Sequence, residues 1–178
     1  MPPFEMTPIT LEMAPDWPIT VGSRARQFMV RHESCAQSVL APFLEDFEIE
    51  SPLAMRLAGA FHSGMCQSLT CGILTGGLMA LGLLIGRDEP EQGLDGLLPI
   101  ISPAQELKGL LEKEFGSVSC KELTGVDFTD LEQAVNFLVS DGHTKCIERV
   151  GSGAEIVARF IAEQAENGTL FCMKAKKS

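Results

Sequence analysis

One apolar segment decides the fold of this chain: Cys71-Gly72-Ile73-Leu74-Thr75-Gly76-Gly77-Leu78-Met79-Ala80-Leu81-Gly82-Leu83. Its hydrophobic residues predict a buried helix over about residues 70–86. Gly72 and Gly76 lie about one turn apart in that helix, and glycine costs about 1 kcal/mol relative to alanine in a helix interior. So many glycines indicate that another helix or a bulky inorganic group approaches the backbone closely. We therefore predict that this glycine-rich helix is central to the fold.

The remaining apolar patterns are also helical, and no stretch carries a convincing strand signal. We expect helices over about 21–47, 52–60, 103–115, 127–139 and 144–165, with Ser51-Pro52 and Ser102-Pro103 marking two of the starts. Prolines at positions 2, 3, 8, 15 and 18 exclude a useful helix from the N-terminal arm. The sequence thus predicts an all-α bundle of about five or six helices. We divide it into an extended proline-rich arm (1–20), a helical domain (21–167) and a tail (168–178).

Length and composition are those of a single globular domain. The chain has 178 residues, of which 45% are hydrophobic and 21% charged, and its formal net charge is −10. Such an acidic chain lacks the basic face that nucleic-acid binding requires. Its longest apolar run, 73–85, is shorter than the ~20 residues of a membrane span, and residues 1–18 do not have the pattern of a secretory signal. We therefore expect a cytoplasmic protein with no membrane span and no nucleic-acid partner.

Cysteines are the main candidates for chemistry: Cys35, Cys66, Cys71, Cys120, Cys146 and Cys172. Without a secretory signal, they are expected to be reduced thiols, metal ligands or catalytic cysteines, and not a disulfide scaffold. There is no C-x-x-C pair, so the spacing supports neither a zinc ribbon nor a thioredoxin-type dithiol. Any shared site must therefore be assembled by the fold, from cysteines on different helices. The alternative for each single cysteine is a small hydrophobic side chain in the core.

Four of the cysteines lie within ordered flanking sequences. These are Ser34-Cys35-Ala36-Gln37-Ser38-Val39-Leu40, Gly64 followed by Thr70-Cys71-Gly72-Ile73-Leu74-Thr75-Gly76-Gly77-Leu78-Met79, Phe115-Gly116-Ser117-Val118-Ser119-Cys120-Lys121-Glu122-Leu123 with Gly125, and Cys146 at the opening of the last helix. Together, over residues 22–163, they resemble the C_GCAxxG_C_C family of redox-active proteins. The resemblance implies that the four cysteines converge. A related domain in split-Soret cytochromes accompanies an iron–sulfur cluster.

The chemistry of thiolates is consistent with that implication. A [2Fe–2S] or [4Fe–4S] cluster is held by about four thiolates, which the resemblance assigns to the four family cysteines. A helix N-terminus at Cys71 would favour its thiolate, and the Gly72 amide could donate a hydrogen bond to a cluster sulfur. Zinc is the less favoured metal, although thiolates bind both.

Other residues near the family cysteines are weaker candidates. Cys66 and His62 are possible additional ligands, because four residues separate Cys66 from Cys71 and His62 lies four residues before Cys66. His32 and His143 each lie three residues before a family cysteine. No residue is assigned a catalytic role and no substrate pocket is predicted, so the enzyme class stays open.

Three hypotheses about function follow. The first is electron transfer or redox sensing through an iron–sulfur cluster, with a redox protein as the partner. The second is a metal-free thiol–disulfide protein in which Cys71 is the attacking thiol of low pKa. The third is a helical binding module without redox chemistry, which uses its glycine-rich helix as a partner surface. A homodimer is a further candidate assembly.

Overall fold

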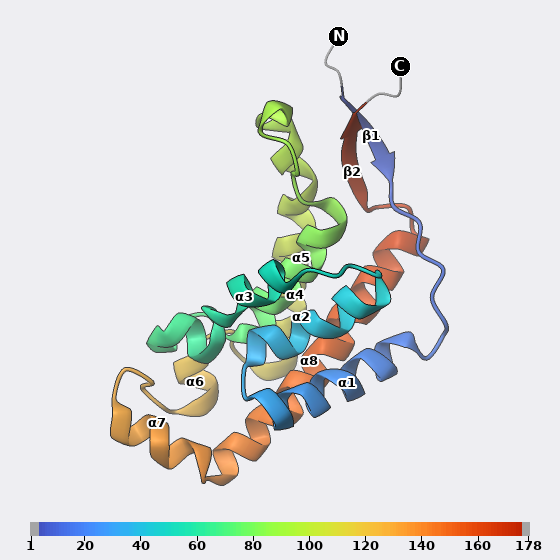
Figure 1. Cartoon of the computed structure of the whole chain (residues 1–178). Helices are drawn as coiled ribbons and strands as arrows, with labels where there is room; N and C mark the ends of the chain where they lie inside the picture. The colour runs from blue at the N-terminus through green and yellow to red at the C-terminus, as the bar shows by residue number, and fades with distance from the viewer. Residues whose placement is uncertain (1–3, 176–178) are drawn as a thin grey trace.

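The computed structural model describes residues 4–175, and these form a mostly helical fold (Figure 1). The helices are α1 (Trp17–His32), α2 (Cys35–Asp46), α3 (Pro52–Gly59), α4 (Gly72–Ile85), α5 (Leu98–Phe115), α6 (Cys120–Thr124), α7 (Leu131–Leu138) and α8 (Asp141–Glu166). Short helical segments η1 (Gly64–Ser68), η2 (Pro90–Gln92) and η3 (Asp95–Leu97) lie in the connections. Two strands, β1 (Phe4–Pro8) and β2 (Phe171–Ala175), pair with each other. The predicted helical class is confirmed.

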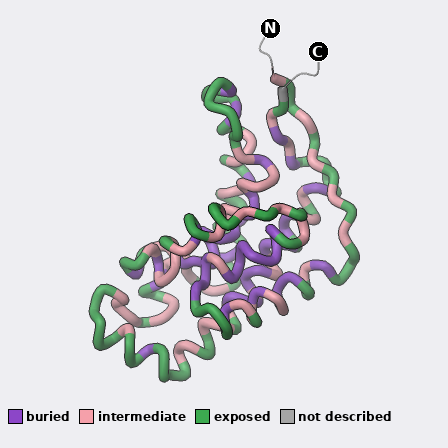
Figure 2. The backbone as a smooth tube through the Cα atoms, viewed as in Figure 1, coloured by how far each residue is buried: buried purple, intermediate pink, exposed green. Residues whose placement is uncertain are grey.

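The glycine-rich helix α4 is the centre of the bundle, as predicted, and packs against α2, α5 and α8. Figure 2 shows the buried residues concentrated where these helices and α1 meet. A Cβ atom at Gly76 would lie 2.7 Å from the Ala36 carbonyl oxygen of α2, and one at Gly77 would lie 2.8 Å from the Val157 side chain of α8. These two adjacent glycines therefore admit α2 and α8 to neighbouring faces of α4.

The most extensive packing between two elements of the fold is that of α1 against α8. It also depends on a small residue, because a Cβ at Gly22 would lie 2.8 Å from the Gly151 carbonyl oxygen. The side chains of Val21 and Val150 are fully buried in this contact region. Because α8 also packs on α4, the α1–α8 pair holds the N-terminal and C-terminal halves of the chain together.

Several helix boundaries differ from the prediction. The single helix expected over 21–47 is divided at Glu33, which has a φ of 54° and ends α1, so that α2 begins at Cys35. Helix α5 begins at Leu98, with Pro99 in its first turn, and Pro103 lies inside it. Helix α8 begins at Asp141 with Ser140 as its cap, which places Cys146 in the second turn instead of at the opening. Together with the short α6, these boundaries give eight α-helices within residues 4–175 instead of five or six.

The expectation that the chain has no strand is wrong for β1 and β2. They pair antiparallel, with Phe4 opposite Ala175 and Pro8 opposite Phe171. This pair lies at the opposite end of the molecule from α6 and α7 (Figure 1). Each strand is only five residues long, and its partner lies near the other end of the chain, so no local sequence pattern predicts the pairing. The predicted arm (1–20) also ends earlier than expected, because α1 begins at Trp17 with Pro18 in its first turn, where proline is tolerated. Residues 1–3 of the arm and 176–178 of the tail lie outside the described residues.

Within residues 4–175, none of the helices combines the length and the apolar composition needed to cross a lipid bilayer.

The α2–α4 contact can be tested with two alanine substitutions in the same helix. Gly76→Ala should destabilise the protein by about 1–3 kcal/mol, because the new methyl group overlaps the backbone of α2. Gly82→Ala is the matched control, since a Cβ there meets nothing within 4 Å and should stabilise the helix by up to about 1 kcal/mol. Urea denaturation of both variants measures the difference. Equal stability of the two would contradict the packing described for α4.

Candidate functional site

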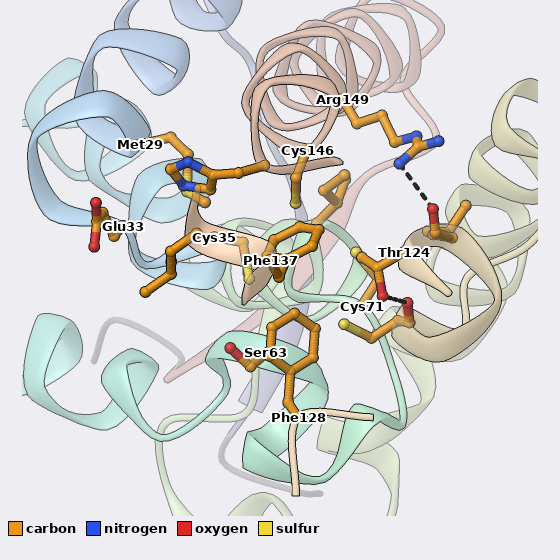
Figure 3. A pocket seen from close by; sticks show the side chains of 15 residues that line it. Met29, Glu33, Cys35, Ser63, Cys71, Thr124, Phe128, Phe137, Cys146 and Arg149 are labelled. Carbon is orange, nitrogen blue, oxygen red and sulfur yellow. Dashed lines mark hydrogen bonds between the residues drawn. The ribbon is translucent and has the colours of Figure 1, made fainter. Parts of the chain in front are cut away.

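The four family cysteines line one cavity. It has a volume of about 50 Å³, and its lining includes Cys35, Cys71, Cys120 and Cys146 (Figure 3). Cys35, Cys71 and Cys120 are buried and Cys146 is partly exposed. These residues come from four different helices or helix starts, so the tertiary structure assembles the group as the sequence requires. Their role as ligands stays a prediction.

Three of the four thiols stand at the start of a helix. Cys35 is the first residue of α2, Cys71 is the N-cap of α4 and Cys120 is the first residue of α6. Backbone N–H groups at helix starts have no partner within the helix, and they carry partial positive charge. The start of each of these helices therefore offers donors to a negatively charged sulfur in the cavity.

Gly72 brings the α4 backbone against Cys35. A Cβ at this position would overlap the Cys35 sulfur and would lie 2.8 Å from the Ala36 nitrogen. The N–H groups of Ser63, Ala36 and Gly72 all act to lower the pKa of the Cys35 thiol. The absence of a side chain at Gly72 thus leaves space for the sulfur of Cys35 on the neighbouring helix.

Two backbone hydrogen bonds hold Cys71 and Cys120 together. The Cys71 N–H donates to the Val118 carbonyl (2.7 Å), and the Cys120 N–H donates to the Leu69 carbonyl (2.6 Å). Between them, segments 69–71 and 118–120 form an isolated antiparallel bridge. This bridge fixes the distance between two chain segments about fifty residues apart, and it places both thiols on the same side of the cavity.

Aromatic rings cover the cavity. The ring of Phe137 packs edge-on against Phe128, with centroids 5.2 Å apart, and against His143, with centroids 5.9 Å apart. The Phe128 N–H donates to Ser68 Oγ (2.6 Å), which anchors the loop before α7 to η1. Figure 3 shows the rings of Phe128 and Phe137 beside the cysteines. We call Phe128, Phe137 and His143 the aromatic cover; it limits access of water to the sulfurs.

Burial raises the pKa of all four thiols. Burial is the largest cause in each case, and it raises the pKa of Cys120 and Cys146 from 9.0 to about 12. The charge of Cys35 also raises the pKa of Cys71, Cys120 and Cys146, which line the same cavity. In the metal-free protein these thiols are therefore neutral at pH 7.

The expectation of a low pKa at Cys71 is therefore wrong for the metal-free protein. The N–H of Ile73 does favour the thiolate, but burial raises the pKa of Cys71 by more than this hydrogen bond lowers it. Arg149 supplies the one positive side chain among the residues that line the cavity; it lowers the pKa of Cys146, and its Nη1 donates to the Leu123 carbonyl (2.9 Å). Four buried thiolates would need more positive charge than this single guanidinium provides.

Cys66 and His62 do not line the cavity. Cys66 is exposed, and its Sγ lies 3.4 Å from His62 Nε2. They belong to a bend in which Ser63, Met65, Cys66 and Ser68 have φ angles of 50°, 61°, 57° and 58°. Left-handed φ angles are unfavourable for residues other than glycine, so the bend is strained. The strained bend places Ser63 in the lining of the cavity. It also places the Ser68 hydroxyl where it accepts a hydrogen bond from Phe128 of the aromatic cover.

Sequence reasoning missed Phe128, Phe137 and Arg149. Aromatic and basic residues at these positions have no spacing that separates them from ordinary surface or core residues. His143, in contrast, did carry a signal, because it precedes Cys146 by three residues and so shares its face of α8.

In residues 4–175, no group of three or more His, Cys, Asp and Glu side chains is arranged to hold a metal ion.

A comparison with protein families settles which group of proteins this chain resembles. The model of the family described as "Putative redox-active protein (C_GCAxxG_C_C)" matches residues 33–160. The chain belongs to the C_GCAxxG_C_C family. The matched range of this redox-active family contains the four cavity cysteines and the aromatic cover, and it confirms the resemblance seen in the cysteine flanks. Neither the curated proteins nor the solved structures include a match to the chain.

Thiol reactivity tests the burial of the site. In metal-free, reduced protein at pH 7.5–8 (about one unit below the ordinary thiol pKa), iodoacetamide should modify the exposed Cys66 first and the cavity cysteines much more slowly, because the thiolate is the reactive form. Peptide mass spectrometry over a time course gives the rate for each cysteine, and the same reaction in urea is the control in which all become reactive. A cavity cysteine that reacts as fast as Cys66 would contradict the structure.

Alkaline pH should destabilise the metal-free protein. The folded-state pKa of Cys120 and Cys146 is about 12, above the value of 9.0 in the unfolded chain, so their contribution is complete below pH 9 and is lost as pH rises toward 12. Urea denaturation at pH 8, 9 and 10 should show a falling free energy of unfolding. Replacement of both residues by alanine should flatten that dependence relative to the unaltered chain. An unchanged slope in the double variant would show that these thiols do not titrate as described.

Proposed function

We propose that the cavity holds an iron–sulfur cluster, and that the protein transfers electrons or senses redox state through it. The observation that carries this proposal is the meeting of four thiols, from segments spread over more than a hundred residues, around one cavity. Small cysteine side chains that merely fill separate holes in a core do not need to meet. Membership of a redox-active family supports the same conclusion.

The electrostatics of the cavity fit a cationic cofactor. The charge of Cys35 raises the pKa of the other three thiols, and burial opposes a negative charge at all four. Iron supplies the positive charge that Arg149 alone cannot, so binding of the group would release the thiol protons and stabilise the fold. The neutral thiols of the metal-free protein and the thiolates of the loaded protein are then two states of the same site.

An iron–sulfur cluster suits this arrangement better than zinc. A single zinc ion needs its thiolates to meet at one point, at Zn–S distances of about 2.3 Å. A cluster distributes its thiolate ligands over two or four iron atoms, so that the sulfurs surround it. The sulfurs here line a cavity, three of them from helix starts and the fourth from the second turn of α8.

The cluster, when bound, would accept and release an electron; the protein would set the potential at which it does so. The N–H groups that face Cys35 and Cys71 stabilise negative charge on sulfur, and this raises a reduction potential. Arg149 acts in the same direction at Cys146. The aromatic cover lowers the reduction potential, in opposition to the N–H groups and Arg149, because exclusion of water disfavours the additional charge of the reduced state.

The aromatic cover also provides a route for electrons. Phe137 is buried in the cover, yet Leu131 and Val135 on the same helix α7 are 79% and 54% exposed. Only the thickness of this helix therefore separates the cavity from a docked partner. We propose a redox protein as the partner, and the net charge of −10 favours a partner with a basic surface. Reduced thiols in all six positions suit the cytoplasm as the location.

The two other hypotheses gain less from the structure. Buried thiols of raised pKa are poor nucleophiles, so Cys71 is not suited to attack a disulfide. The glycines at 72, 76 and 77 face α2 and α8 of the same chain, and this leaves those faces of α4 without free surface for a homodimer or another partner. Cluster binding is the function that the cavity supports best.

Anaerobic reconstitution with iron and sulfide tests the proposal. The unaltered chain should acquire absorption at about 300–500 nm that bleaches with dithionite, together with stoichiometric iron. Separate alanine variants of Cys35, Cys71, Cys120 and Cys146 should lose most of this iron, whereas Cys66→Ala should keep it, because Cys66 lies outside the cavity.

Three outcomes would overturn the proposal in different ways. Protein that stays colourless and free of iron after reconstitution would exclude the cluster. Colourless protein with bound zinc would indicate a structural metal site. Loss of iron in Cys66→Ala as complete as in the cavity variants would show that the set of ligands is wrong.

A further inference from the structure

One residue of the cavity has a buried polar atom without a partner. Within residues 4–175, the Nε2 atom of His143 is buried and forms no hydrogen bond, and among the residues that line the cavity no other buried side-chain nitrogen or oxygen shares this condition. Buried polar atoms are almost always paired, so each exception calls for an explanation. The sequence had marked His143 only by its distance of three residues from Cys146.

The local structure holds the His143 ring at the cavity. The backbone N–H of His143 donates to the Ser140 carbonyl (3.1 Å) in the first turn of α8, and the imidazole ring packs edge-on against Phe137. Cys146 follows three residues later, on the same side of this helix. The ring thus lies against Phe137, among the residues that line the cavity together with the four sulfurs.

The neighbouring side chains do not supply the missing partner. The other charged residues that line the cavity are Glu33 and Arg149; Glu33 is exposed, and Arg149 donates to the Leu123 carbonyl. The thiols of the four cysteines complete the polar lining together with Ser63 and Thr124, and Thr124 Oγ1 donates to the Cys120 carbonyl (2.7 Å). What remains is a partner that occupies the cavity itself.

We propose that His143 Nε2 donates a hydrogen bond to a sulfur of the bound cluster and thereby raises its reduction potential. This inference rests on the proposed function, and it adds a positioning and tuning residue outside the set of four ligands. Reduction adds a negative charge to the cluster, and a fixed N–H donor stabilises the sulfurs that carry this charge. Cys35, Cys71, Cys120 and Cys146 would hold the cluster, while His143 would set its potential.

The first test compares reduction potentials in reconstituted protein. His143→Leu should bind the same amount of iron as the unaltered chain, but its potential should be more negative by an amount equal to about a tenfold change in the ratio of oxidised to reduced cluster, which is 59 mV for one electron. His143→Gln should restore part of the shift, because its amide can donate. His32→Leu is the matched control, since His32 is exposed and does not line the cavity.

The second test uses the unaltered chain, so it does not depend on the folding of a variant. In protein with ¹⁵N-labelled histidine, electron–nuclear double resonance of the reduced cluster should show one weakly coupled nitrogen, as a hydrogen bond requires. His143→Gln should lack that signal. A strongly coupled nitrogen would overturn the proposal in favour of direct iron ligation, and no coupling would overturn it in favour of a water or another partner.

The two proposals fail in different ways. If the unaltered chain takes up no cluster, the proposed function fails, and the role of His143 fails with it. If the cluster binds and the potentials of His143→Leu and His32→Leu are the same, only the role of His143 fails.

Discussion

At Gly72 the backbone of α4 lies directly against the sulfur of Cys35, and the rest of the structure depends on this contact. A side chain at this position would overlap that sulfur, and a Cβ at Gly76 would meet the α2 backbone one turn later. The two helices can approach this closely only because α4 lacks side chains on that face. The approach places Cys35 next to Cys71, the N-cap of α4. The remaining two thiols reach the same cavity through the 69–71/118–120 bridge and through α8.

The cavity combines two demands that oppose each other. Close packing of helix starts brings thiols and backbone donors together, but the same burial keeps the thiols neutral, as the pKa of about 12 at Cys120 and Cys146 shows. Charge can be accommodated there only together with a cation. For this reason we propose a cationic cluster as the occupant of a site that is inert as a set of thiols. The strained 63–68 bend places Ser63 in the lining of the cavity and Ser68 in a hydrogen bond with Phe128.

The cover of the cavity links the site to the surface. Phe128, Phe137 and His143 close it with a single layer of rings, and α7 lies outside with Leu131 largely exposed. This thin cover shields the buried sulfurs of Cys35, Cys71 and Cys120, whereas Cys146 stays partly exposed. The cover carries the buried and unpaired Nε2 of His143, so it belongs to the lining of the cavity as well as to its boundary.

Local sequence by itself determined the helices, the glycine-rich centre and the four cysteines of the family. These features depend on residues three or four positions apart, or on single residue types such as Gly76 and Cys71, so they can be read without knowledge of the fold. The tertiary structure alone decided the pairing of β1 with β2, the break at Glu33, the exclusion of Cys66 from the cavity and the aromatic cover. It also decided that burial, and not the helix start, governs the pKa of Cys71. The physical reason is that each of these depends on segments far apart in the chain, whose separation and burial exist only once α2, α4 and α8 have packed.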